Sequence, residues 1–193
     1  MSDATPKNRG TLIALAILFI GPLAVAWTLY LTGIWRPGAG ANHGDFIQPI
    51  ISLPRTPQPT ADKGATDGGY LYGKWTLVHL ADKNCDEQCR AAVVKTRQIR
   101  LAMGREVDRI DRVLFSHEGP APGFGAEQPD LLVVLPTGAA GEQIVAALLA
   151  NGGDERIFLV DPLGNLILSY PLDGDPADIR DDLRKLLRLS RIG

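Results

Sequence analysis

The sequence contains two cysteines, Cys85 and Cys89, in positions i and i+4. Two cysteines are too few for a disulfide-stapled scaffold, so their close spacing indicates one functional pair. At this spacing on a helix, the side chains share a face and the Cα atoms lie ~6 Å apart, which a disulfide can span. The pair can therefore cycle between dithiol and disulfide, or it can offer two thiolates to a soft metal such as Cu(I).

The residues beside the cysteines act on the thiols in opposite directions. The start of a helix favours the thiolate at Cys85, which makes Cys85 the expected nucleophile. Asp86 and Glu87 suit the helix dipole, but their negative charges raise the pKa of a nearby thiol. Lys83 and Arg90 partly offset these charges, so the net direction of the shift in thiol pKa stays open. The alternative is a pair of unrelated cysteines or a passive structural disulfide, although a disulfide that closes so short a loop adds little stability.

The segments on either side of the pair predict the elements that position it. The apolar, β-prone run 75–81 predicts a strand that leads directly to the cysteines. The segment 86–103 predicts a helix that ends at Gly104. The expected inward positions of this helix are Ala91, Val94, Ile99 and Ala102.

The whole segment 70–193 predicts one α/β domain. Apolar runs and turn residues predict further strands at 110–115, 131–135, 156–160 and 166–170, and further helices at 141–150 and 176–189. The last helix is amphipathic, and its expected core residues are Ile179, Leu183, Leu186 and Leu187. This order of strands and helices is typical of an α/β sandwich.

The segment 11–35 predicts a transmembrane anchor. No charged residue occurs between Gly10 and Trp35, and a helix of this length crosses a hydrocarbon core of ~30 Å. A cleaved signal peptide is the alternative, because Ala39-Gly40-Ala41 resembles a cleavage site. However, the apolar region of a signal peptide is typically shorter than this run.

Basic residues near the ends of the anchor predict its orientation. Lys7 and Arg9 precede the helix, whereas Arg36 stands alone just after it. This bias favours a cytoplasmic N-terminus, residues 1–10, with the rest of the chain outside. In a bacterium, this describes a single-pass inner-membrane protein with a periplasmic domain, where a thiol pair can change its redox state.

The segment 36–69 predicts a flexible linker between the anchor and the domain. It is rich in prolines and glycines, among them Pro49, Pro54, Pro57 and Pro59. The apolar stretch 46–51 is the exception, because it can pack on the domain as an edge strand.

Two motifs resemble the Sco family of cytochrome c oxidase assembly proteins. The first is Gly73-Lys74-Trp75, an apolar strand and Cys-x-x-x-Cys. The second is the apolar strand and turn Ile157-Phe158-Leu159-Val160-Asp161-Pro162-Leu163-Gly164. The resemblance implies a membrane-anchored α/β protein of thioredoxin-like fold, with a central mixed sheet flanked by helices. It also implies that Cys85 and Cys89 bind copper or reduce disulfides for the copper site of the oxidase.

The sequence departs from this family at two places. Asp86 stands where members usually carry a proline. The loop 150–156 lacks the histidine that serves as the third copper ligand of the family. The thiol pair is therefore the first interpretation of the site, and a metal site is the second.

The histidines have different expected roles. His117 follows the second strand of the domain, at the edge where an α/β site forms, and it is the candidate third ligand of a metal held by Cys85 and Cys89. A solvated loop histidine is the alternative at this position. His79 is expected to be half-buried in the strand 75–81, and His43 is expected in the linker, with a metal role as its alternative.

Together these observations predict a thiol-disulfide oxidoreductase in which Cys85 attacks and Cys89 resolves. The alternatives are a Cu(I)-binding metallochaperone with the same cysteines and a non-catalytic, membrane-anchored interaction module. Cu(I) is the only cofactor that the pattern suggests. The expected partners are the lipid bilayer and, by the resemblance, a haem–copper oxidase subunit or another copper chaperone. A net charge of −2 gives no basic field for nucleic acid.

Overall fold

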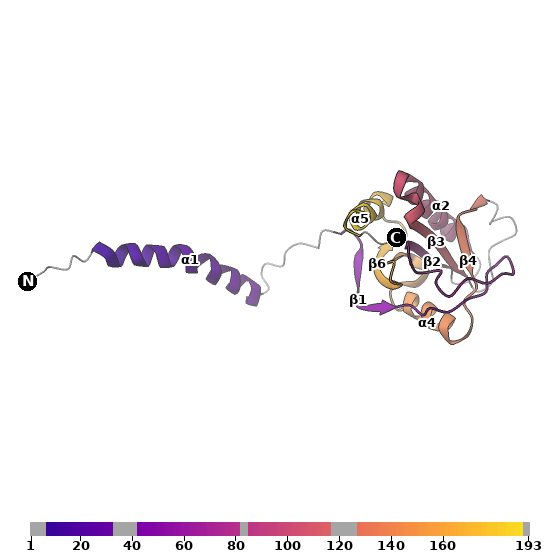
Figure 1. Ribbon diagram of the computed structural model, residues 1–193, viewed down its shortest axis with the longest axis horizontal. Coiled ribbons are helices and arrows are strands. Elements are labelled where there is room, and N and C mark those ends of the chain that lie inside the picture. The colour runs from indigo at the N-terminus through magenta and orange to yellow at the C-terminus, as the bar shows by residue number, and fades with distance from the viewer. Residues whose placement is uncertain (1–6, 33–41, 82–84, 117–126, 191–193) are drawn as a thin grey trace, which may run out of the picture. The chain divides into compact units, whose positions relative to one another are not determined.

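The structure is a computed structural model, and it describes residues 7–32, 42–81, 85–116 and 127–190 (Figure 1). The chain forms two compact units, Met1–Gly40 and Ala41–Gly193. The first unit holds one helix, and the second holds a mixed sheet with helices on both faces.

The first unit contains helix α1, Lys7–Thr32. Its apolar segment Gly10–Thr32 spans 23 residues and has no part buried inside the protein. A helix needs ~20 apolar residues to cross a bilayer, so α1 has the length and composition of a membrane span. Thr28 and Thr32 donate their hydroxyl groups to carbonyl oxygens one turn earlier, at 2.7 and 2.8 Å, so these polar groups are satisfied within the helix.

The second unit is built on a six-stranded sheet with the order β1-β6-β5-β2-β3-β4. β2 is parallel to β3 and β3 is parallel to β4, whereas β5, β6 and β1 continue the sheet by antiparallel pairing. The strands are β1 Asp45–Ser52, β2 Trp75–Ala81, β3 Ile110–Ser116, β4 Leu131–Val134, β5 Arg156–Val160 and β6 Asn165–Pro171.

Helices cover the two faces of this sheet (Figure 1). Helix α4, Gly138–Leu149, packs on one face, and helices α2, Glu87–Ala102, and α5, Pro176–Leu189, pack on the other. Short 3-10 helices, Gly104–Arg109 and Gly153–Glu155, precede β3 and β5. This arrangement confirms the predicted α/β sandwich with a central mixed sheet.

Strand β2 lies at the centre of the domain. Every residue of β2 is buried, because helices cover both of its faces. Val78 and Leu80 join the core under α4, whereas Trp75 and Leu77 join the core under α2 and α5. The apolar character of the whole run 75–81 follows from this double burial.

The segment 42–69 belongs to the folded unit. β1 pairs with β6, and beyond it Leu53 and Gln58 are buried. The side-chain oxygen of Gln58 accepts the backbone N–H of Thr137 at 2.8 Å, which ties this segment to the start of α4. The prediction of a flexible linker over 36–69 is therefore wrong from residue 42 onward, while the edge strand predicted for 46–51 is confirmed.

The prolines of this segment explain the error. Pro49 lies within β1, which is an edge strand and so tolerates the missing N–H. Pro54, Pro57 and Pro59 follow β1 in a segment that packs on the domain without forming a strand of its own. Proline content alone does not separate such a segment from a linker.

Helix α2 lies close to its predicted bounds but presents a different face to the core. Its buried residues are Cys89, Ala92, Val93, Thr96 and Ile99. The expected inward residues that are exposed instead are Ala91, Val94 and Ala102. The prediction counted apolar side chains only, and it missed that Thr96 faces inward to accept a hydrogen bond from the buried Arg112 at 3.1 Å.

Helix α5 has the predicted core face. Ile179, Leu183 and Leu187 are buried, and Leu186 packs against them while partly exposed. The sequence pattern did not predict that Asp182 is also buried on this helix.

Candidate thiol-disulfide site

Cys85 and Cys89 form a disulfide, and their Cα atoms lie 5.1 Å apart. Cys85 lies just before the first turn of α2, and Cys89 lies within that turn. The central strand β2 ends four positions earlier, at Ala81. The structure therefore brings the two predicted cysteines together, at the junction of the central strand and the helix that follows it.

Asp86 fixes the start of this helix. It is the N-cap residue of α2, and its side-chain oxygen accepts the backbone N–H of Cys89 at 2.9 Å. A side chain that satisfies one of the open N–H groups at a helix start stabilises the helix. Asp86 thus sets the position of Cys89 relative to Cys85, a role that a proline at this position lacks.

The disulfide is enclosed by apolar side chains. Cys85 is 8% exposed and Cys89 is 5% exposed. They pack with residues from the ends of β2, β3 and β4 and from α2: Ala81, Leu114, Val133 and Val93. Because apolar surroundings disfavour a charged thiolate, this environment suits the uncharged disulfide.

A buried arginine holds α2 on the sheet next to the disulfide. The Arg112 guanidinium donates to the Val93 carbonyl oxygen at 2.5 Å and to the Thr96 hydroxyl at 3.1 Å. It also donates to Gln128 at 3.2 Å and to Asp130 at 3.0 Å. The sequence signal for this network is an arginine inside the mostly apolar strand β3.

The charges of this network support one another. Burial lowers the pKa of Arg112, although the bond to Asp130 works against that shift. Burial also acts to raise the pKa of Asp130, but the hydrogen bond and charge of Arg112 outweigh it and lower that pKa. The pair therefore stays charged, and the guanidinium keeps α2, β3 and the segment before β4 together.

His79 lies on β2 and is more deeply buried than predicted, with 3% exposed. Its Nδ1 lies 3.0 Å from the carbonyl oxygen of Arg156. Burial lowers the pKa of His79, while this hydrogen bond and the charges of Asp154 and Asp86 oppose the shift. The imidazole is therefore a neutral part of the core that bridges β2 and β5.

The other histidines do not complete a metal site in the described part of the chain. His117, the candidate third ligand, lies outside the described residues. His43 was expected in a linker, but its backbone N–H donates to Asp182 of α5 at 2.7 Å. Across 7–32, 42–81, 85–116 and 127–190, no group of three or more His, Cys, Asp or Glu residues could hold a metal ion.

A comparison with protein-family models decides the family. The model described as the transmembrane-like, thioredoxin-like, C-terminal domain matches residues 75–190. The chain belongs to this family. The match runs from the start of β2 to the end of α5, so the disulfide lies inside the thioredoxin-like part.

As a member of this family, the chain shares its fold with solved Sco structures. Copper-bound ScoI of Bradyrhizobium japonicum has 18% identity and a TM-score of 0.54, over 70% of this chain and 98% of that one. Apo Sco1 of Thermus thermophilus has 16% identity and a TM-score of 0.58, over 77% and 99%. BsSco, reported with a disulfide switch, has 18% identity and a TM-score of 0.52, over 76% and 100%. No curated protein matches the chain.

These comparisons confirm the predicted thioredoxin-like fold and the structural likeness to Sco proteins. The place of the disulfide in the family fold, after the central strand and at the start of a helix, is the geometry on which a function can be proposed.

Proposed function

We propose that the protein is a membrane-anchored thiol-disulfide exchange protein that assists assembly of a cytochrome c oxidase. The observation that carries this proposal is the Cys85–Cys89 disulfide at the start of α2 in a thioredoxin-like domain. BsSco, which shares the fold, is described as a member of the Sco family of cytochrome c oxidase assembly proteins. The target is a cysteine pair in a haem–copper oxidase subunit or in another copper chaperone.

The exchange runs in two steps from the dithiol form. The Cys85 thiolate attacks one sulfur of the target disulfide, that disulfide breaks, and a mixed disulfide forms. The Cys89 thiolate then attacks the Cys85 sulfur, which releases the target as a dithiol and forms the Cys85–Cys89 disulfide. Two electrons pass to the target, and a second dithiol protein must return them to this chain before the next cycle.

The surroundings of the pair favour the reducing direction. Apolar burial and the Asp86 carboxylate both disfavour a thiolate and so favour the disulfide. A pair that is more stable as a disulfide gives up its electrons more readily once it has been reduced. The protein thus acts as a reductant toward its target.

The proposed location follows from α1 and from the basic residues around it. Lys7 and Arg9 precede the apolar segment and Arg36 follows it, which favours a cytoplasmic N-terminus and a periplasmic domain. The redox chemistry then takes place outside the cytoplasm, where disulfides persist and need dedicated reductants.

Copper is treated as cargo of a target protein in this proposal. In the structure the two sulfur atoms are bonded to each other, and no third ligand joins them among the described residues. The donor groups in these parts of the chain therefore do not fit a three-ligand copper site, and no step of the exchange is assigned to copper.

A trapping experiment tests the exchange. In Cys89→Ser the second step cannot occur, so the full-length variant in its native membrane should accumulate a mixed disulfide with its target. Cys85→Ser is the matched control and should give no such adduct. Identical adducts in both variants, or an adduct in neither, would contradict the assignment of attacking and resolving cysteines.

Deletion of the gene tests the place of the exchange in oxidase assembly. Loss of the protein should lower the copper content and activity of the oxidase, and the wild-type gene should restore both, whereas Cys85→Ser should not. Unchanged oxidase copper in the deletion strain would refute the role in assembly. Copper binding by the reduced full-length chain, compared with Cys85→Ala, separates a metallochaperone from a thiol reductant.

A further inference from the structure

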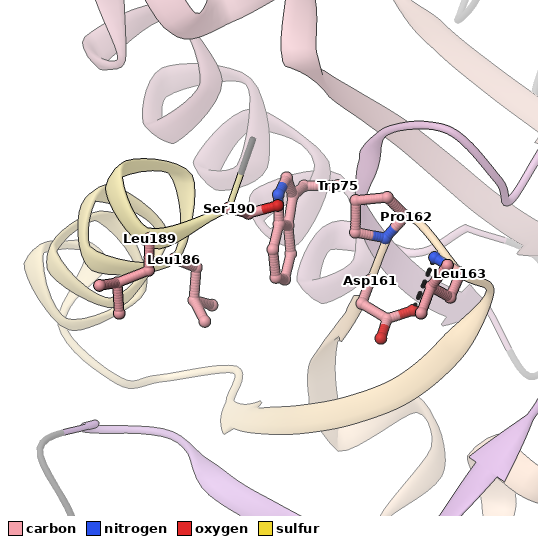
Figure 2. Close-up of a pocket in the computed structure, with 7 residues that line it drawn as sticks. All are labelled: Trp75, Asp161, Pro162, Leu163, Leu186, Leu189 and Ser190. Atoms are coloured by element: carbon pink, nitrogen blue, oxygen red, sulfur yellow. Dashed lines mark hydrogen bonds between the residues drawn. The ribbon is translucent and has the colours of Figure 1, made fainter. Parts of the chain in front are cut away.

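A groove lies at the opposite end of β2 from the disulfide. It has a volume of about 290 Å³ and an apolar lining. Figure 2 shows Trp75 between two walls: Leu186 and Leu189 on α5, and Pro162 and Leu163 in the turn between β5 and β6. The outer residues are strongly exposed, since Leu163 is 62% and Leu189 is 82% exposed.

Basic side chains lie near Leu189 along the same helix. Arg184, Lys185 and Arg188 are exposed on the second half of α5, and no acidic residue follows Asp182 on this helix. Asp161, the acidic residue of the groove, is engaged within its own turn, where its carboxylate accepts the N–H groups of Leu163 and Asn165 at 2.9 and 2.8 Å. The second half of α5 thus presents an exposed leucine beside three basic side chains, of which Arg184 also pairs with Asp181 at 3.6 Å.

The chain joins the folded unit on the same helix. Asp182 on α5 is buried, with 2% of the residue exposed. Its carboxylate accepts the backbone N–H groups of His43 and Gly44 at 2.7 and 3.0 Å. It also accepts the Tyr170 hydroxyl at 3.1 Å. Gly44 has no room for a side chain, because a Cβ there would lie 2.6 Å from the Tyr170 ring. These bonds fix the first described residues of the unit on α5.

The distance from α1 to this point is limited by chain length. Only the segment 33–41 separates Thr32 of α1 from Asn42, and it can span at most ~35 Å whatever its conformation. If α1 lies in a bilayer, the point where the chain meets α5 therefore lies at most ~35 Å from Thr32, the end of α1. A lipid surface is then permanently within reach of α5.

We propose that the second half of α5 and the turn 161–164 form a docking surface for an anionic membrane. Leu163 and Leu189 insert among the lipid headgroups, and Arg184 and Arg188 contact their phosphates, which is the composition typical of interfacial binding. The inference rests on the membrane anchorage in the proposed function. β2 is about 20 Å long, so docking at its Trp75 end leaves the disulfide end directed away from the lipid.

Fluorescence quenching in nanodiscs tests this surface. The full chain is reconstituted at one copy per disc, and an added cysteine at Leu163→Cys carries an environment-sensitive label, while Cys85 and Cys89 stay in their disulfide. Brominated lipid should quench this label in discs that contain phosphatidylglycerol, and much less in discs of phosphatidylcholine alone. A label at Leu149→Cys, which replaces an exposed leucine on α4, is the matched control and should be quenched in neither.

Charge variants complete the test. Arg188→Gln should lower the ratio of docked to undocked molecules about fivefold, since one basic side chain near an anionic surface contributes about that factor. Arg90→Gln removes another exposed charge, at the cysteine end, and should leave the ratio unchanged. Equal quenching at 163 and 149, or equal quenching at 163 in both lipids, would overturn the proposal. Failure of the chain to remain with the discs would instead refute the anchor.

Discussion

The side chains around the two ends of β2 differ in their exposure to solvent. At the cysteine end, the disulfide is enclosed by apolar side chains, and Arg112 holds its helix by hydrogen bonds to the backbone and to Thr96. At the Trp75 end, the helix α5 and the turn 161–164 leave large leucines exposed around a groove. The disulfide is enclosed, while the exposed leucines Leu163 and Leu189 lie about one strand length away.

This difference indicates a division of roles along one strand. A buried disulfide is protected from small thiols in solution, so exchange depends on a partner that gains access to it. An exposed apolar surface, in contrast, is where a soluble domain meets a partner or a membrane. The predictions below compare what residues at the cysteine end and elsewhere in the domain contribute to stability and to the disulfide.

The largest effect on stability is expected from Arg112→Leu at the cysteine end. The variant leaves Asp130, Gln128 and the Val93 carbonyl without their shared donor, so the free energy of unfolding should fall by about 3 kcal/mol. Urea unfolding of the full chain in detergent, followed by near-ultraviolet circular dichroism, measures this loss. Arg97→Leu removes a more exposed partner of Asp130 and should cost well under half as much.

A smaller loss is expected from Asp182→Ala on α5, where the chain enters the folded unit. Two backbone N–H groups and the Tyr170 hydroxyl lose their acceptor, which should cost about 2 kcal/mol in the free energy of unfolding. Proteolysis should then begin near His43. Asp181→Ala, on the exposed side of the same helix, is the control and should change stability by less than about 0.5 kcal/mol. An equal loss in the two variants would refute a special role for Asp182.

A still smaller loss is expected from Asp86→Ala, which removes the N-cap of α2. The free energy of unfolding should fall by about 1 kcal/mol, whereas Asp86→Asn keeps an acceptor and should cost less. Both variants remove the negative charge beside the cysteines, so both should make the disulfide easier to reduce. Equilibration of the full chain with dithiothreitol measures this change, and a shift in Asp86→Ala alone would assign it to the cap instead of the charge.

The smallest effect is the pH dependence that His79 contributes. Its pKa in the folded protein is lowered by burial, so the unfolded chain takes up a proton more readily. The stabilisation that His79 contributes is therefore complete above the unfolded pKa of about 6.5 and is lost as the pH falls toward the folded pKa. Unfolding experiments between about pH 7.5 and about pH 5, a range that brackets the unfolded pKa, measure the free energy of unfolding. This free energy should fall less steeply with decreasing pH in His79→Gln than in the unchanged protein. An unchanged slope would assign the pH dependence to other groups.

The elements that the sequence predicted well are those whose signals are local. The strand 75–81, the cysteine spacing and the apolar stripe of α5 each depend on residues within a few turns of one another, and each is present in the structure. The α/β sandwich was predictable for the same reason, because the order of such elements limits the ways in which they can pack. Its thioredoxin-like form was expected from the resemblance to the Sco family.

The errors have a different origin, namely contacts between residues far apart in the chain. The inward face of α2 depends on a hydrogen bond from Arg112 to Thr96 on a neighbouring element. The segment 42–69 folds because β1 pairs with β6, more than one hundred residues later. No local pattern carries these pairings, and His117 lies outside the described residues, so its predicted role in the site stays a prediction.

The folding of 42–69 into the domain also sets how often the domain meets its neighbours. A flexible tether of residues 33–69 could extend ~130 Å, whereas a tether of residues 33–41 is limited to ~35 Å. If α1 spans a bilayer, the effective concentration of a partner in the same bilayer falls roughly as the −3/2 power of the tether length, so shortening the tether from about 37 to about 9 residues raises it roughly eightfold. For the proposed exchange, weak affinity for a membrane-bound target would then be enough, and the domain would release this target quickly after each cycle.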